Sequence, residues 1–153
     1  MLFICNFKKT KFMKKSILTL AILISLMANA QELPKNFNEL VKNIEPQLIG
    51  WRHHFHEFPE LSNREFNTGK YIADYLRTIG LEVKHPFAKT GVVAILKGNK
   101  PGPVIGLRAD IDALPVTERA PIAFASKVKA DYNGQQVNVM HACGHDAHTA
   151  ILM

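Results

Sequence analysis

Near the C-terminal end of the sequence stands the stretch His141-Ala142-Cys143-Gly144-His145-Asp146-Ala147-His148. Its thiol, imidazole and carboxylate side chains are the ligand types that a zinc ion prefers. Cys143 and His145 are two positions apart, and residues two apart point to the same side of an extended segment. Gly144 between them lets the backbone pass close to an ion and tolerates unusual dihedral angles. The pattern predicts that Cys143 and His145 bind one metal ion.

The residues on either side of this stretch predict the elements that carry it. Residues 136–140 alternate as a short strand that leads into it, and residues 146–153 have the composition of a helix's first turns. Asp146 is the expected N-cap of that helix. His148 follows His145 by three residues, so it is a candidate third ligand, with a capping role or a role in orienting a ligand as the alternatives.

Most of the net charge of +6 comes from the N-terminal thirty residues. These contain no acidic residue and five lysines, and without those five the remaining 14 basic residues stand against 13 acidic ones. The rest of the chain therefore has no charge excess that would favour nucleic acid as a partner.

Residues 1–30 have the pattern of a signal peptide. A positive start at Met13-Lys14-Lys15 precedes the apolar run of residues 16–27, which is short for a membrane span. Ala28-Asn29-Ala30 is a small-x-small cleavage site, so we expect cleavage after Ala30, with Met13 as an alternative start. An uncleaved N-terminal anchor is the competing interpretation. The cleaved chain would be exported, to the periplasm or outside the cell, without a stable membrane anchor.

Cleavage would leave Cys143 as the single cysteine, because Cys5 lies in the removed segment. A lone cysteine cannot form an internal disulfide, so it is either a buried free thiol or a ligand. Its neighbours favour the ligand.

Apolar spacing and turn residues predict two helices followed by strands. Residues 37–58 have helical spacing, with a kink or break expected at Pro46. A capping box at Ser62-Asn63-Arg64-Glu65 opens a second helix to about Ile79. Strands are expected at 81–84, 91–96 and 104–107, with a hairpin-type turn at 97–103 and irregular structure over 113–133. This order predicts an α/β fold with a central mixed sheet flanked by helices.

Two further groups could contribute to a site. Asp110-Ile111-Asp112 follows the third expected strand and places both carboxylates on one side of the chain, as metal ligands, as partners that orient a ligand, or as caps of a solvated turn. His53, His54 and His56 lie near the end of the first expected helix, and we favour surface and capping roles for them over ligand roles.

Four motifs together resemble one family. They are Arg52-x-x-x-His56-x-x-Pro59-Glu60, Thr90-Gly91-Val92-Val93-Ala94, Leu107-Arg108-Ala109-Asp110-Ile111-Asp112-Ala113-Leu114-Pro115 and Met140-His141-Ala142-Cys143-Gly144-His145-Asp146. The sequence from about residue 37 to its end resembles the metal-dependent amidohydrolase branch of the carboxypeptidase/aminoacylase metallopeptidases, which includes hippurate hydrolase, N-acyl-amino-acid amidohydrolases and auxin-conjugate hydrolases. The last two motifs are the specific ones. His53 departs from the pattern, where a second basic residue is common.

The resemblance implies a zinc-peptidase-like catalytic domain with two adjacent divalent ions, zinc or manganese. It implies Cys143 and His145 as metal ligands and Asp112 as the carboxylate that orients a ligand. Asp110 falls where the peptidase branches have a ligating histidine. The implied reaction is hydrolysis of the amide bond of an N-acyl amino acid or small peptide by metal-activated water, and a homodimer is compatible with the full-length form.

In this family a glutamate base and further ligands lie downstream of the cysteine motif. We therefore expect residues 31–153 to be the N-terminal part of the catalytic domain, truncated and inactive by itself, since a catalytic zinc site needs about three protein ligands. A non-catalytic, metal-binding exported protein is the alternative function, and a structural fragment without a function of its own is a third.

Overall fold

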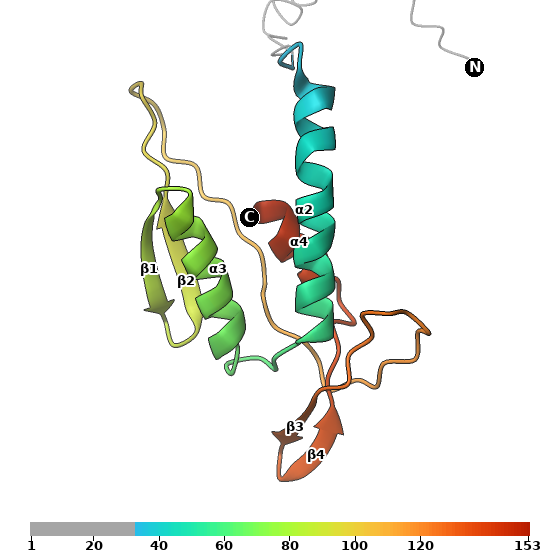
Figure 1. The fold of residues 1–153 in the computed structure, drawn as a ribbon. Coiled ribbons are helices and arrows are strands. Elements are labelled where there is room, and N and C mark those ends of the chain that lie inside the picture. Colours follow the sequence, from blue (N-terminus) through green and yellow to red (C-terminus); the bar gives the residue numbers. More distant parts are fainter. Residues whose placement is uncertain (1–32) are drawn as a thin grey trace, which may run out of the picture. The chain divides into compact units, whose positions relative to one another are not determined.

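The computed structural model describes residues 33–153, and the expected signal peptide lies outside the described residues. Within this part of the chain Glu39–Met153 forms one structural unit. The helices are α2 (Phe37–Glu57), α3 (Phe66–Thr78) and α4 (His145–Leu152). The strands are β1 (Glu82–Phe87), β2 (Gly91–Ile95), β3 (Lys129–Tyr132) and β4 (Gln135–Asn138), as Figure 1 shows. No helix among the described residues is long and apolar enough to cross a membrane.

The first expected helix is confirmed as α2, which continues through Pro46 without a break. A proline inside a helix removes one backbone hydrogen bond, and the helix tolerates that loss here. The C-terminal half of α2 turns Trp51 and Phe55 inward, and both are buried. They pack with Ile72 of α3 and Ala150 of α4, so the main apolar cluster joins all three helices. The ring centroids of Trp51 and Tyr75 lie 4.6 Å apart, edge to face.

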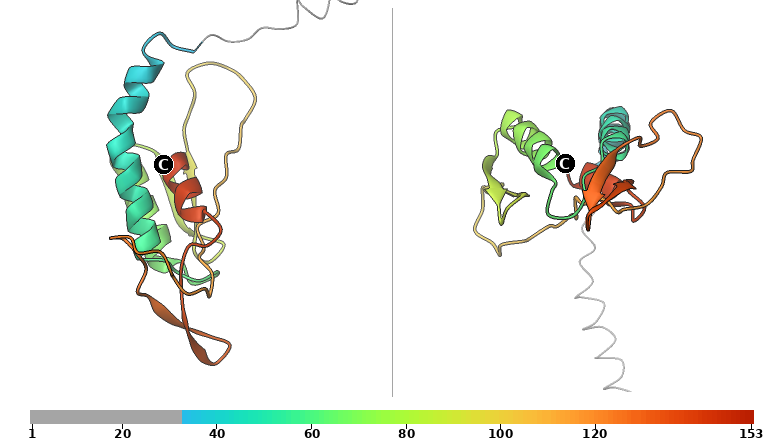
Figure 2. Two further views of the ribbon diagram at one scale, coloured as in Figure 1. Left: turned by 90° about the vertical axis from the view of Figure 1, so that its right-hand side faces the viewer. Right: turned by 90° about the horizontal axis from the view of Figure 1, so that it is seen from below.

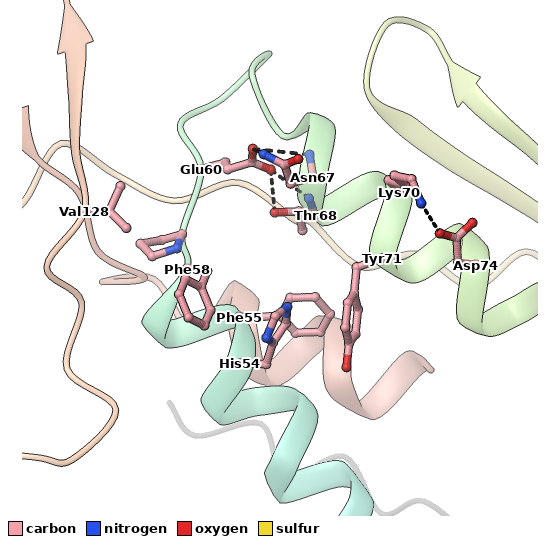
Figure 3. A pocket seen from close by; sticks show the side chains of 11 residues that line it. His54, Phe55, Phe58, Glu60, Asn67, Thr68, Lys70, Tyr71, Asp74 and Val128 are labelled. Atoms are coloured by element: carbon pink, nitrogen blue, oxygen red, sulfur yellow. Dashed lines mark hydrogen bonds and ion pairs between the residues drawn. The ribbon is translucent and has the colours of Figure 1, made fainter.

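The second helix is confirmed as α3, but its predicted capping box is not formed. The N-cap residue is Glu65, and its side chain forms no capping hydrogen bond with the start of the helix. Instead the Glu60 carboxylate accepts hydrogen bonds from the backbone N–H groups of Asn67 and Thr68, at 3.2 and 2.7 Å, and from the Thr68 hydroxyl (Figure 3). Glu65 is buried and accepts a hydrogen bond from the Thr90 hydroxyl at 2.7 Å. A more distant carboxylate therefore satisfies the free N–H groups of this helix end.

The strands form two separate antiparallel pairs, β1–β2 and β3–β4. The β1–β2 hairpin packs on α3, and its tight turn includes Ala88 and Lys89, both at positive φ. The chain also reverses at the expected turn over 97–103 (Figure 1), but this turn closes no β-hairpin, because residues 104–107 form no strand in the described part of the chain. Figures 1 and 2 show the β3–β4 hairpin extending away from the three helices. The mixed α/β class is confirmed.

Residues 104–107, expected to form a third buried strand, form no strand in the described part of the chain. Val104 is 99% exposed and Leu107 is 77% exposed. A strand is stable only when neighbouring backbone groups pair with it, and the described residues provide no such neighbour for this segment. Conversely, the expected irregular region 113–133 contains β3, which pairs with β4.

A second, smaller apolar cluster fixes the segments that lead to the metal-ligand stretch. It consists of Leu61, Ala113 and Val139, all buried. Leu61 forms a parallel bridge to Ala113, and Leu114 forms an antiparallel bridge to Met140. These bridges place the Asp110–Asp112 region beside the strand that enters the His141–His148 stretch.

Candidate metal centre

Helix α4 begins at His145, and Gly144 is its N-cap. Gly144 has φ +82°, in the left-handed region that glycine adopts without a steric penalty. The prediction that Asp146 is the N-cap is therefore wrong by two positions. The turn at Gly144 starts the helix earlier, and the Asp146 side chain accepts hydrogen bonds both from His56 of α2 and from the backbone N–H of Ala147.

The side chains of His145 and Asp112 are in direct contact. Nδ1 of His145 lies 2.9 Å from the backbone oxygen of Asp112 and 3.1 Å from its carboxylate Oδ1. Both partners are acceptors, so Nδ1 carries a proton and donates it, and in the neutral form of the ring Nε2 keeps its lone pair. A ligating histidine commonly has this arrangement, in which a carboxylate fixes the tautomer and the ring orientation.

The carboxylate of Asp110 faces the other nitrogen of the same ring. Its Oδ2 lies 4.0 Å from Nε2 of His145, and its other oxygen pairs with Arg108. The Thr149 hydroxyl, on the next turn of α4, donates to the backbone oxygen of Asp110 at 3.1 Å. The two aspartates of the Asp110-Ile111-Asp112 motif thus lie on both sides of the His145 imidazole.

Cys143 and His148 are the remaining predicted or candidate ligands, and both are exposed. The ring centroids of His145 and His148 are 5.8 Å apart. The described residues contain no group of three or more histidine, cysteine or acidic side chains placed to hold one ion. Thiol, imidazole and carboxylate donors fit a zinc-type ion by their chemistry, and the ligand roles of Cys143 and His145 stay predictions.

His56 is a residue of this region that the sequence interpretation placed at the surface, and that prediction is wrong. It is 5% exposed. Its Nδ1 lies 2.8 Å from Oδ2 of Asp146 and its Nε2 lies 2.7 Å from Oε2 of Glu118. Arg52, one turn earlier on α2, adds an ion pair to Asp146 at 3.4 Å. His56 and Arg52 both belong to the first of the four family motifs, which was the available signal.

His53 and His54 do not share this environment. His53 stacks on Phe124, with ring centroids 3.7 Å apart, and His54 stacks on Tyr71 at 4.2 Å. Burial lowers the pKa of His54, although Glu57 opposes this effect. His54 and Tyr71 line a cavity of about 560 Å³ between the end of α2 and the start of α3, as Figure 3 shows. No predicted metal ligand lines this cavity.

The two carboxylates that hold His56 both have lowered pKa values. Two backbone N–H groups, those of Ala120 and Arg119, donate to Glu118, and the Ala120 N–H together with the His56 ring contributes most to lowering the pKa of Glu118. Burial by itself would raise the pKa of Asp146, but hydrogen bonds from His56 and from the Ala147 N–H outweigh burial and lower it. Both groups are therefore stabilised as carboxylates.

His141 is buried beside these pairs, and neither of its ring nitrogens has a hydrogen-bond partner among the described residues. Burial lowers the pKa of His141 to about 4. Its ring is accordingly neutral near pH 7. It lines a cavity of about 760 Å³ together with Arg52, Glu118, Gly144 and Asp146. Ala142 and Gly144, which are sequence neighbours of the predicted ligands Cys143 and His145, also line this cavity.

Comparison with known proteins gives matches over most of the described residues. Residues 106–153 match the model of peptidase family M20/M25/M40. The chain is 46% identical over 113 residues to the N-acetyl-L-cysteine deacetylase of Bacillus subtilis, covering 74% of this chain and 25% of that protein. It is 42% identical over 120 residues to the N-acyl-L-amino acid amidohydrolase of Geobacillus stearothermophilus, covering 78% and 30%.

A solved structure is similar as well. A crystal structure from Bacillus subtilis, described as a dinuclear metal-binding peptidase, aligns with a TM-score of 0.62 at 47% identity and covers 71% of this chain and 28% of that one. The chain thus spans between a quarter and three tenths of the length of these proteins.

Proposed function

Because the chain belongs to peptidase family M20/M25/M40, we propose that it carries the first part of the active site of an exported metal-dependent amidohydrolase. The substrate class we propose is an N-acyl amino acid or small peptide, hydrolysed at its amide bond. The names of the two relatives support this class, since one is a deacetylase of N-acetylcysteine and the other an amidohydrolase of N-acyl amino acids.

The observation that carries the proposal is the environment of His145. Asp112 accepts the hydrogen bond of Nδ1, which leaves Nε2 free for a metal ion. Cys143 precedes it by two residues with an exposed thiol, the other donor of the predicted pair. We assign Cys143 and His145 as ligands and Asp112 as the residue that orients His145 and raises the basicity of its ring.

Two divalent ions are the proposed cofactor, in line with the dinuclear description of the Bacillus subtilis structure. Zinc or manganese would suit the thiol, imidazole and carboxylate donors. When bound, such ions lower the pKa of a water molecule and polarise the scissile carbonyl. The residues of this chain hold and orient the ligands, and the further ligands and the general base are proposed to lie in the portion of the relatives beyond the matched region.

Export is the part of the proposal that rests on residues 1–30 alone. The positive start, the apolar run and the Ala28-Asn29-Ala30 site are typical of a cleaved signal. We place the mature protein in the periplasm or outside the cell. N-terminal sequencing of the exported protein tests this, and a mature chain beginning at Gln31 is the expected result.

The activity is tested by assaying amide hydrolysis on a panel of N-acyl amino acids with Zn²⁺ or Mn²⁺ added. Residues 31–153 are compared with the same residues joined to any reading frame that continues beyond Met153. We expect turnover by the extended form only, and its loss in the extended Cys143→Ala variant. Turnover by residues 31–153 alone would contradict the proposed division of the site, and no turnover by either form would contradict the amidohydrolase function.

A further inference from the structure

His56 is held at both ring nitrogens by carboxylates that come from distant parts of the chain. Asp146 is 90 residues away in sequence and Glu118 is 62 residues away. All three side chains are at most 7% exposed. The imidazole thus connects the C-terminal turn of α2 to the first turn of α4 and to the loop at residues 117–120.

Both contacts are hydrogen bonds at the same time when the ring carries a proton on each nitrogen, because a carboxylate only accepts. A neutral ring would point a lone pair at one of the two carboxylates from less than 3 Å. A ring protonated on both nitrogens would instead offset one of the two buried negative charges, and Arg52 forms an ion pair with Asp146 at 3.4 Å. Removing only one partner of a buried, paired arrangement of this kind is strongly destabilising, since it leaves an uncompensated charge.

The position of Asp146 links the His56 cluster to the predicted metal ligand His145. Asp146 follows His145 directly in the first turn of α4, and the two side chains are held by different partners. His145 contacts Asp112 on one side, and Asp146 contacts His56 on the other. Gly144, at the start of this turn, has no side chain that could hold it in place. These two side-chain contacts hold the backbone at residues 144–146, together with the Arg52 ion pair to Asp146 and the hydrogen bonds from the N–H groups of Ala147 and His148 to the Gly144 oxygen.

We propose that His56 is a positioning residue for the metal centre. It holds the start of α4 through Asp146 and Glu118, and so keeps the His145 ring in the orientation that presents Nε2 to the ion. This inference rests on the proposed metal-binding role of His145. It does not require His56 to touch the metal or the substrate.

The test compares the 153-residue chain with its His56→Gln variant. Glutamine carries both of its N–H donors on one nitrogen, so it cannot place a donor at each of the two positions that the ring nitrogens occupy. The first readout is Co²⁺ titration, in which a cysteine ligand gives a thiolate-to-metal absorption band. The second is the tautomer of His145 in the metal-free chain, read from the ¹⁵N shifts of its ring. We expect Co²⁺ affinity to fall about 10-fold, as for other residues that orient a ligand, and a second His145 tautomer to appear.

His54→Gln is the matched control. It makes the same substitution on the same helix two residues earlier, where the ring stacks on Tyr71 and contacts no carboxylate of residues 33–153 at hydrogen-bond distance. It should bind Co²⁺ as the unmodified chain does. If His56→Gln does not fold, as judged by circular dichroism, Glu118→Gln is used instead, because it keeps the shape of the side chain and removes only the charge.

The outcomes separate this inference from the proposed function. Unchanged Co²⁺ affinity and an unchanged His145 tautomer in the folded His56 or Glu118 variant would overturn the positioning role. Absence of Co²⁺ binding by the unmodified chain would count against metal binding by this chain, and the tautomer measurement would still decide the role of His56.

Discussion

Oδ1 of Asp112 lies 3.1 Å from Nδ1 of His145, and the backbone oxygen of Asp112 lies 2.9 Å from the same atom. One residue therefore accepts twice from one ring nitrogen, across 33 positions of sequence. The charge of the carboxylate increases the basicity of the ring, and the double contact fixes its orientation. A substitution at Asp112 removes the carboxylate but leaves the backbone oxygen in place. The effects of the two contacts on His145 can therefore be measured separately.

Replacing Asp112 by asparagine should lower metal affinity without unfolding the chain. The amide oxygen of Asn can still accept from Nδ1, and the backbone oxygen is unchanged, so the expected loss is that of the charge, about 10-fold. Isothermal titration with Zn²⁺ measures it. Asp74→Asn is the matched control, since Asp74 is an exposed carboxylate on α3 that pairs with Lys70 and Arg77. Equal affinities for both variants would refute the orienting role of Asp112.

The sequence predicted a site at Cys143, His145 and Asp112 because these residues lie in two short motifs. The structure brings Asp112 and His145 into contact, and the ligand roles stay predictions. The sequence did not identify the environment of His56. A histidine at the polar end of a helix is usually a surface residue, and its burial here results from Asp146 and Glu118, which are 90 and 62 positions away. Local spacing carries no information about partners at that distance. The motif that joins Arg52, His56 and Pro59 was the one available indication.

The sequence predicted the helices correctly, but the strand that it predicted at residues 104–107 does not form in the described part of the chain. The apolar stripe of α3 predicts a helix whatever its neighbours are, because Ile72 and its companions face one side. Residues 104–107 have the composition of a buried strand, yet strand formation depends on a neighbouring strand. The described residues offer none, and the segment is exposed. Composition can predict the tendency of a segment, while pairing decides the result.

Glu60 should matter more for stability than Ser62, which the sequence favoured as the cap of α3. The Glu60 carboxylate accepts from two backbone N–H groups and one hydroxyl, whereas the Ser62 hydroxyl has only a 3.5 Å contact with Asn63. We expect Glu60→Ala to lower the free energy of unfolding by about 1–2 kcal/mol. Ser62→Ala should change it by less than about 0.5 kcal/mol. Urea denaturation of the two variants decides between the caps, and the reverse order would show that the capping box forms in solution.

Gly69 and Gly50 should respond in opposite directions to alanine. A Cβ at Gly69 would lie 2.4 Å from the backbone oxygen of Thr90 and 2.8 Å from the His85 ring, so the β1–β2 hairpin would have to move away from α3. We expect Gly69→Ala to destabilise the chain by about 1–3 kcal/mol. A Cβ at Gly50 meets nothing within 4 Å, and alanine there should stabilise α2 by about 0.5–1 kcal/mol. Thermal midpoints of the two variants measure this difference, and a neutral Gly69→Ala would show that the hairpin is not packed against α3 as described.

Acid should weaken the fold through Glu118. The pKa of this carboxyl is lowered in the folded chain, first by the Ala120 N–H and then by His56, so below its ordinary value of 4.5 the unfolded chain binds more protons than the folded one. The contribution of Glu118 is therefore fully present above that value and is lost as the pH falls through the lower pKa of the folded state. Urea denaturation between pH 7 and pH 3 measures the slope. Glu118→Gln removes the titrating group and should give a shallower loss of stability on acidification, while Glu57→Gln, at an exposed position on α2, should keep the slope of the unmodified chain. An identical slope in Glu118→Gln would mean that this buried carboxylate contributes nothing to the acid sensitivity of the fold.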